Sequence, residues 1–172
     1  MRNIVAICAA ALAVASPAVA QAATFSPDGT YVFTGSVEVK KNLPVWTTCG
    51  LTLTINVSGG VATSSASLSG AFPCTGITFT GSPFATDGLG SPVTVLEIAG
   101  VSINIPAIPP AFPADSCSGD LYAIWNGSGT PTIEFQDGTS DTPDASAPGT
   151  DPNCKIKGTV TQTSPGTPLV IS

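Results

Sequence analysis

The sequence predicts an all-β fold, a single antiparallel β-sandwich or barrel-like domain of about eight or nine short strands. Three observations predict it. Apolar and polar residues alternate with a period of two in several segments, the period of a strand with one buried face. Turn-forming residues separate these segments at intervals of roughly 8–12 residues. No segment has a sustained helical period, and the 18 Gly and 16 Pro residues favour strands and turns.

Residues 1–23 are predicted to be a signal peptide that is cleaved on export. A basic residue precedes an alanine-rich apolar run over residues 4–14, and small residues allow cleavage after Ala20 or Ala22. The apolar run is shorter than the roughly 20 residues that a membrane-spanning helix needs. We therefore expect residues 24–172 to form an exported domain without a transmembrane segment, located outside the cell, at its surface or in the periplasm.

The first predicted strands lie in the N-terminal half of this domain. Residues 31–39 alternate apolar and polar side chains, and residues 51–57 do so most regularly, with Leu, Ile and Val at every second position. Ser58-Gly59-Gly60 forms a tight turn, after which residues 61–68 return as the partner strand of a hairpin.

The middle of the chain predicts shorter strands. Ile77 and Phe79 alternate with threonines, and a Gly-rich loop is expected over residues 87–90. Residues 93–98 and 101–105 are predicted to be two strands, because the Ala-Gly pair between them suits a turn.

The C-terminal part predicts a second hairpin and a long polar loop. Because proline removes hydrogen-bond donors from a ladder, the proline-rich segment after the strands of the middle region should be a loop or an edge. The Asn-Gly-Ser-Gly sequence suits a hairpin turn. In chain order we expect a loop or edge over residues 106–113, strands over 121–125 and 132–136, a flexible acidic loop over 139–152, a strand over 155–161 and a short closing strand over 169–171.

Four cysteines remain once Cys8 is removed with the signal peptide. An even number in an exported chain predicts two disulfides, and four cysteines allow three pairings. The first hairpin brings the segment after its second strand back toward Cys49, which favours a bond from Cys49 to Cys74 and leaves Cys117 to pair with Cys154. A zinc site is disfavoured, because the chain has no CxxC motif and no histidine.

The residues do not predict an enzyme or a cofactor. Without histidine, neither a Ser-His-Asp nor a Cys-His arrangement can form. A serine–lysine pair is conceivable, but all four lysines of the domain lie in turns or alternate with polar positions, so we expect them to be solvated. Glu38, Glu97 and Glu134 lie on separate predicted strands, and nothing in the sequence brings two of them together as glycoside hydrolysis requires.

The charge pattern excludes some partners and suggests few binding sites. With 5 basic and 11 acidic residues, the chain lacks the positive surface that nucleic acids need. Trp46 and Trp125 suit either ligand stacking or ordinary core and rim positions. We predict no metal site. Calcium is the alternative, because Asp137, Asp141 and Asp144 crowd into the acidic loop, although their spacing does not match an EF-hand.

The residues as a set resemble a known family. The domain opens with TFSP, followed in order by VEVKKNLPVWTTCGLTLTINV, LSGAFPCTGITFTGSPF, CSGDLYAIWN and NCKIKGTV. This order and its four-cysteine frame are similar to the bacterial protein activators of alkane oxidation, the PraB-like secreted proteins. The resemblance implies a secreted or surface β protein of Gram-negative bacteria, linked to biofilm matrix, adhesion and growth on hydrocarbons. It implies disulfides at the four cysteines and carries no catalytic residues.

Three functions follow as expectations. The first is a non-enzymatic structural or adhesive protein of the cell surface or biofilm matrix, which self-associates or binds surface components through strand edges. The second is an accessory module that binds hydrocarbon or lipid in a groove bordered by apolar strand faces and by the proline-rich segment 106–113. The third is a pilin-like fibre subunit, for which the segment before Tyr31 is short and poorly alternating.

Overall fold

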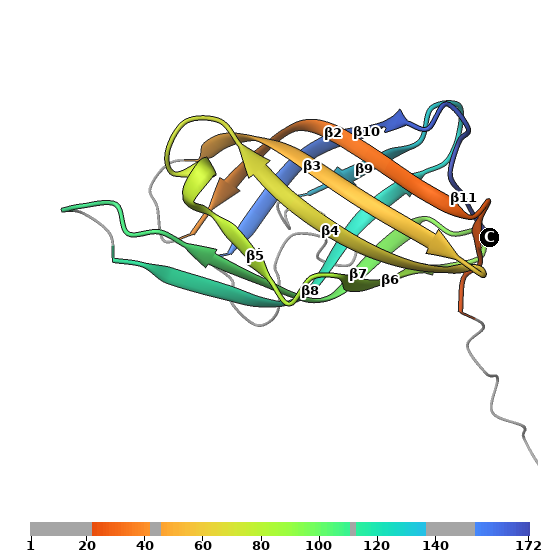
Figure 1. The fold of residues 1–172 in the computed structure, drawn as a ribbon, viewed down its shortest axis with the longest axis horizontal. Coiled ribbons are helices and arrows are strands. Elements are labelled where there is room, and N and C mark those ends of the chain that lie inside the picture. The colour runs from red at the N-terminus through yellow and green to blue at the C-terminus, as the bar shows by residue number, and fades with distance from the viewer. Residues whose placement is uncertain (1–21, 42–45, 111–112, 137–153) are drawn as a thin grey trace, which may run out of the picture.

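The computed structural model describes residues 22–41, 46–110, 113–136 and 154–172, and this part of the chain is all-β (Figure 1). Its elements are eleven strands and one 3₁₀ turn. In chain order they are β1 (Phe25–Ser26), β2 (Gly29–Lys40), β3 (Thr47–Ser58), β4 (Val61–Ser69), the 3₁₀ turn η1 (Cys74–Gly76), β5 (Thr78–Thr80), β6 (Phe84–Leu89), β7 (Val95–Ile105), β8 (Asp115–Asn126), β9 (Thr132–Phe135), β10 (Lys155–Ser164) and β11 (Val170–Ile171).

Eight of the strands pair into a closed antiparallel barrel. Around the ring the order is β2, β3, β4, β6, β7, β8, β9 and β10, and β10 pairs with β2 to complete it. β5 pairs with the C-terminal part of β7 as a ninth strand of the same sheet. β1 and β11 form a separate two-stranded sheet. The predicted all-β fold is thus confirmed, and of the two architectures expected, sandwich or barrel, the barrel is the one formed.

The interior of the barrel follows the alternation in the sequence. On β3, Leu51, Leu53, Ile55 and Val57 are buried while the threonines and asparagine between them are not. Facing strands contribute larger rings, and Phe33 meets Trp125 edge-on with 6.2 Å between ring centroids. The two-residue period therefore places the apolar face of each strand inside the barrel.

The expected loop over residues 87–90 is wrong for most of its length, because β6 is a strand that reaches Leu89. β6 pairs with β4 up to Thr86 and with β7 up to Leu89, and the pairing of Asp87 and Gly88 with β7 overrides their low strand preference. Gly88 is needed here, because a Cβ on it would lie 2.8–2.9 Å from the side chains of Ile171, Val93 and Ala23.

The two strands expected over 93–98 and 101–105 are one strand, β7, with a bulge. Its register with β8 shifts between Ile98 and Val101, where Gly100 adopts a φ of +66°. The backbone N–H of Gly100 donates to Asp120 Oδ1 at 2.8 Å. The Ala-Gly pair therefore bends a continuous strand and does not reverse the chain.

One end of the barrel is closed by the small β1–β11 sheet, beside the C-terminus (Figure 1). Phe25, Leu169 and Ile171 are buried there. Gln162, itself buried, fixes the segment before β11. Its side-chain amide donates to the carbonyls of Pro165 and Thr167 at 2.8 and 2.7 Å, and its Oε1 accepts the N–H of Leu169 at 2.9 Å.

We expect Gln162→Leu to lower the free energy of unfolding by about 2–4 kcal/mol, because it removes three hydrogen bonds and leaves the buried N–H of Leu169 unpaired. Thr161→Ala, at the exposed neighbouring position, is the matched control and should change stability by less than about 0.5 kcal/mol. Urea unfolding of both variants checks this. Equal unfolding midpoints for the two variants would show that the hydrogen bonds of the Gln162 side chain, which we call the Gln162 clamp, contribute nothing to stability.

The two tyrosines of the chain both have raised pKa values. The hydroxyl of Tyr31 donates to the Pro27 carbonyl at 2.6 Å; burial raises its pKa, and the nearby Asp28 carboxylate raises it further. The hydroxyl of Tyr122 donates to Glu97 Oε1 at 3.1 Å, and this hydrogen bond raises its pKa first, followed by burial and by the charges of Glu97 and Asp120.

Because an unfolded tyrosine ionises near pH 10, the folded state holds its phenolic protons more tightly than the unfolded state. The tyrosine contribution to stability should therefore be complete below about pH 10 and be lost as the pH rises above that value. Tyrosinate absorbance, followed alongside circular dichroism, should show little ionisation near pH 10 in the folded protein. Tyrosines that titrate normally while the fold is intact would contradict this expectation.

Candidate functional site

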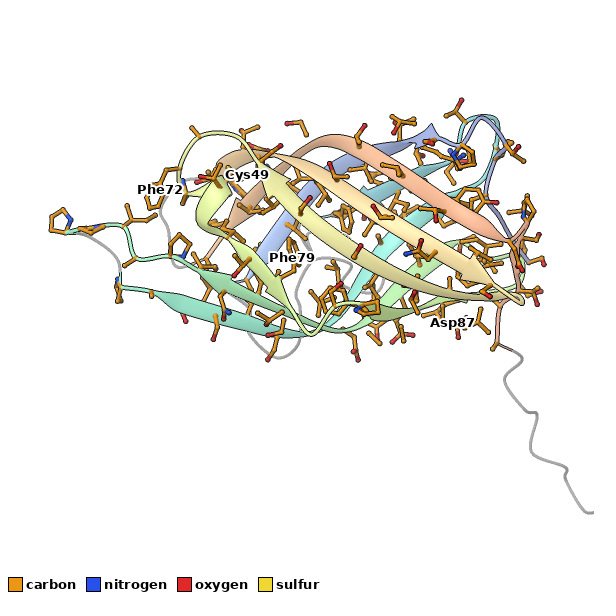
Figure 2. All side chains as sticks on the ribbon, in the orientation of Figure 1. Cys49, Phe72, Phe79 and Asp87 are labelled. Carbon is orange, nitrogen blue, oxygen red and sulfur yellow. A yellow bond between two sulfur atoms is a disulfide. The ribbon has the colours of Figure 1, made fainter. Side chains whose placement is uncertain are left out.

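The end of the barrel opposite the β1–β11 sheet carries both disulfides. Cys49 on β3 is bonded to Cys74 on η1, with 5.6 Å between Cα atoms, and Cys117 on β8 is bonded to Cys154 before β10, with 6.2 Å. These are the pairs that the hairpin argument favoured. In Figure 2, Cys49 and Phe72 lie toward this end, Phe79 lies between the two ends and Asp87 lies toward the other. The β7–β8 hairpin extends beyond the rest of the barrel here (Figure 1).

An apolar pocket, which we call the mouth pocket, opens at this end. Its cavity measures about 60 Å³. Seven strands or their flanking residues contribute to its wall, so that it lies across the open end of the barrel and not between two neighbouring strands. The apolar lining comprises Val39, Leu68, Pro73, Ile77, Phe79, Ile103, Ile105, Ile108 and Ile156, together with Cys117 and Cys154 of one disulfide.

A second, smaller cavity of about 20 Å³ lies deeper in the barrel. Its lining is almost entirely apolar and includes Leu53, Phe84 and Leu121. Phe79 and Ile156 line both cavities. These two half-buried side chains therefore belong to the walls of both cavities.

Lysines surround the mouth pocket. Lys40, Lys41 and Lys155 line it. Lys41 corrects the expectation of four solvated lysines, because its side chain is only 7% exposed, and its Nζ lies 3.7 Å from Asp115 Oδ2. The physical reason is its position directly after β2, where it lies against the apolar mouth under the extended β7–β8 hairpin that carries Ile105 and Asp115.

Trp46 lies at the rim of this end, half-buried, where it contacts cations. The Nζ of Lys157 lies 4.4 Å from its ring centroid and that of Lys40 lies 5.8 Å away. Lys157 also forms an ion pair with Glu38, with 3.0 Å between Nζ and Oε2. Trp46 is therefore a rim residue beside the lysines, and Trp125, the other candidate, is part of the core.

A comparison of the chain with models of known protein families gives one match. A family model described as alkane oxidation protein activator PraA/PraB-like matches residues 1–171. The chain belongs to this family. No curated protein and no solved structure matches it. The resemblance drawn from the order of sequence segments is thus confirmed for essentially the whole length of this PraA/PraB-like chain.

Two features bear on where the PraA/PraB-like chain works. Its two disulfides are typical of proteins in an oxidising compartment. Across the described ranges, none of the helical structure is long and apolar enough to cross a bilayer. The signal peptide expected over residues 1–23 falls almost entirely outside the described residues and stays a prediction.

The carboxylates considered for chemistry are engaged elsewhere. Glu38 pairs with Lys157, Glu134 accepts a hydrogen bond from Gln136, and Glu97 accepts the Tyr122 hydroxyl. The structure places Asp87 opposite Glu97 on β6 and β7, a neighbour that the strand pattern did not reveal. Asp87 Oδ1 accepts hydrogen bonds from the backbone N–H groups of Ala23 and Gly88.

No metal site is found among the residues that the structure describes, where no three Cys, Asp or Glu residues gather suitably. The calcium candidates Asp137, Asp141 and Asp144 lie outside those residues, as does the acidic loop expected over 139–152. The calcium alternative is therefore still only a prediction.

Sequence reasoning missed the mouth pocket and its lysines in this PraA/PraB-like chain. One signal was present. Lys40-Lys41 follows an apolar strand position, and Lys155 and Lys157 flank Ile156, so that both lysine pairs lie at strand ends next to apolar residues. Only the pairing of β2 with β10 shows that the end of β2 and the start of β10 are neighbours.

Proposed function

We propose that this protein is a non-enzymatic accessory protein that binds an apolar alkyl chain at the mouth of its barrel. The observation that carries the proposal is the apolar mouth pocket, whose lining continues through Phe79 and Ile156 to a second apolar cavity. Ligand sites are concave, mostly apolar and frequently found at the mouths of β-barrels. Membership of the alkane oxidation activator family supports the same conclusion, because alkanes and their oxidation products carry such chains.

The cavities are small beside a whole ligand. The 60 Å³ of the mouth pocket would accommodate only the end of an alkyl chain in the conformation described. The half-buried Ile103, Ile105 and Phe79 lie around it and belong to short or protruding elements. If an entering alkyl chain displaced these side chains, their apolar surfaces would contact the ligand and would stay out of water. Binding would therefore replace one apolar contact with another.

The adhesive or biofilm-matrix function is less well supported by the geometry. Self-association through strand pairing needs free edges, and each of the eight barrel strands has a neighbour on both sides. The same closure argues against a pilin-like subunit, which needs a gap for a donor strand. Within the described sheet, β5 pairs only with β7 and is short. Export to the cell surface or the medium is part of the proposal and rests on the signal-peptide pattern.

Titration with 1-dodecanol, followed by thermal unfolding and by tryptophan fluorescence, tests the proposal. Binding should raise the unfolding temperature, since a ligand at about 100 times its Kd adds about 2.7 kcal/mol to stability. Ile105→Gln, in the pocket wall, should weaken binding about tenfold. Val61→Gln is the matched control, because Val61 is an exposed apolar residue outside that wall. Absence of any alcohol-dependent stabilisation, or equal effects of both substitutions, would contradict the proposal.

A further inference from the structure

The basic side chains of the described residues all lie at one end of the barrel. They are Lys40 and Lys41 at the end of β2, and Lys155 and Lys157 at the start of β10. The chain as a whole is acidic, with a formal net charge of −6. The positive charges are therefore concentrated beside the mouth pocket, and we call the pair Lys40 and Lys155 the lysine collar.

The collar is an unfavourable arrangement for the empty protein. Lys40 and Lys155 are directly opposite each other in the β2–β10 ladder, and like charges at such positions repel. The charge of Lys157, two residues after Lys155, is compensated by Glu38, with 3.0 Å between Nζ and Oε2. None of the described carboxylates forms an ion pair with Lys40 or Lys155. The Nζ of Lys40 also lies 5.8 Å from the centroid of the Trp46 ring. An anion bound near both ammonium groups would reduce the repulsion between them.

The collar adjoins the pocket. Lys40 and Lys155 line the mouth pocket next to Val39 and Ile156, and Ile156 also lines the inner cavity. Cations beside an apolar pocket match a molecule with an anionic head and an apolar tail. A plain hydrocarbon would leave the collar unused, and a cationic amphiphile would be repelled by it.

We infer that the mouth pocket selects single-chain anionic amphiphiles, with fatty acids as the ligand class, the carboxylate between Lys40 and Lys155 and the chain directed past Phe79 and Ile156. This inference rests on the proposed function, since it needs an alkyl chain in the same pocket, and it adds the head group. Carboxylate–ammonium hydrogen bonds are stronger than neutral ones. The ligand is then an oxidised chain, which places the protein after a reaction that converts a hydrocarbon chain into a carboxylic acid.

The test compares four probes of known charge at low salt, each below its critical micelle concentration: dodecanoate, 1-dodecanol, dodecyltrimethylammonium and acetate. Calorimetry on the full domain should show dodecanoate binding at least about tenfold more tightly than dodecanol, with no binding of acetate and weaker binding of the ammonium compound. The preference for dodecanoate should shrink at high salt, because exposed charges are screened.

The variants assign the preference to the collar. Lys40→Gln with Lys155→Gln should remove the preference, so that dodecanoate binds no more tightly than dodecanol. The charge-reversed pair Lys40→Glu with Lys155→Glu should prefer the ammonium compound. Lys157→Gln is the matched control, because Lys157 does not line the pocket, and it should keep the preference. Circular dichroism checks that each variant is folded.

The outcomes separate the two proposals. If dodecanol binds the parent protein as tightly as dodecanoate, or if the double glutamine variant keeps the preference, the inference about the head group is overturned while alkyl-chain binding stands. If acetate binds as well as dodecanoate, the collar is an anion site independent of the pocket, and the inference is again overturned. If no twelve-carbon probe binds, both proposals fail.

Discussion

Gly35→Ala is expected to lower the free energy of unfolding by about 3 kcal/mol or more, a large fraction of the roughly 5–15 kcal/mol that stabilises an ordinary domain. Gly35 on β2 is opposite Val160 on β10. A Cβ on Gly35 would collide with the backbone carbonyl oxygen of Thr159 and lie 2.9 Å from the Cα of Val160. These are backbone atoms, which cannot rotate away, so the two strands would have to separate where β10 closes the barrel.

Gly158→Ala should have a similarly large effect from the partner strand. Its Cβ would lie 2.6 Å from the Ser36 carbonyl oxygen, and its φ of +132° disfavours any other residue. Gly166→Ala is the matched control, since no atom lies within 4 Å of the added Cβ. Thermal unfolding of the three variants decides the matter. Gly35→Ala and Gly166→Ala variants with the same unfolding temperature would show that the β2–β10 contact is not close in solution.

Removal of the Cys117–Cys154 disulfide by double alanine substitution is expected to cost about 4 kcal/mol, because the bond closes a loop with a sequence separation of 37. Removal of Cys49–Cys74, with a separation of 25, should cost about 3.5 kcal/mol. Both estimates attribute the stabilisation mainly to restriction of the unfolded chain. Urea unfolding of each double variant measures them, and peptide mapping of the parent protein checks the pairing.

The two disulfides should differ in their effect on binding. Cys117 and Cys154 line the mouth pocket, whereas Cys49 and Cys74 do not. Loss of the Cys117–Cys154 bond should therefore weaken dodecanol binding at temperatures where the variant is still folded, and loss of the Cys49–Cys74 bond should leave it close to that of the parent. Equal binding by both folded variants would be evidence against the location of the site at the mouth.

The proposed function assigns different tasks to the two ends of the barrel. A closed barrel buries its apolar faces and satisfies its backbone groups, so that one end can be specialised for binding. Here the β1–β11 sheet and the Gln162 clamp close one end, and the disulfide-bonded end retains an apolar opening. Binding and presentation of a chain require no catalytic group.

Much of the fold could be predicted from the sequence, because strand alternation is a local signal. The period of two fixes which side chains share a face, and residues 51–57 with the turn after them predicted the β3–β4 hairpin. The same hairpin brings Cys49 and Cys74 together, so that their bond could be anticipated from neighbouring residues alone. The family could be recognised for a similar reason, since the order of segments and cysteines is written directly in the chain.

Other features depend on contacts between distant residues, and only the tertiary structure decided them. Alternation is the same in a sandwich and in a barrel, and the choice depends on β10 pairing with β2 and β7 with β8. Asp87 and Gly88 look like a loop in the sequence, and only their pairing with Glu97 and Leu96 of β7 makes them part of a strand. Lys40 and Lys155 look like ordinary surface lysines, because their strands are far apart in sequence. Only closure of the ring makes them opposite residues in one ladder, beside an apolar pocket.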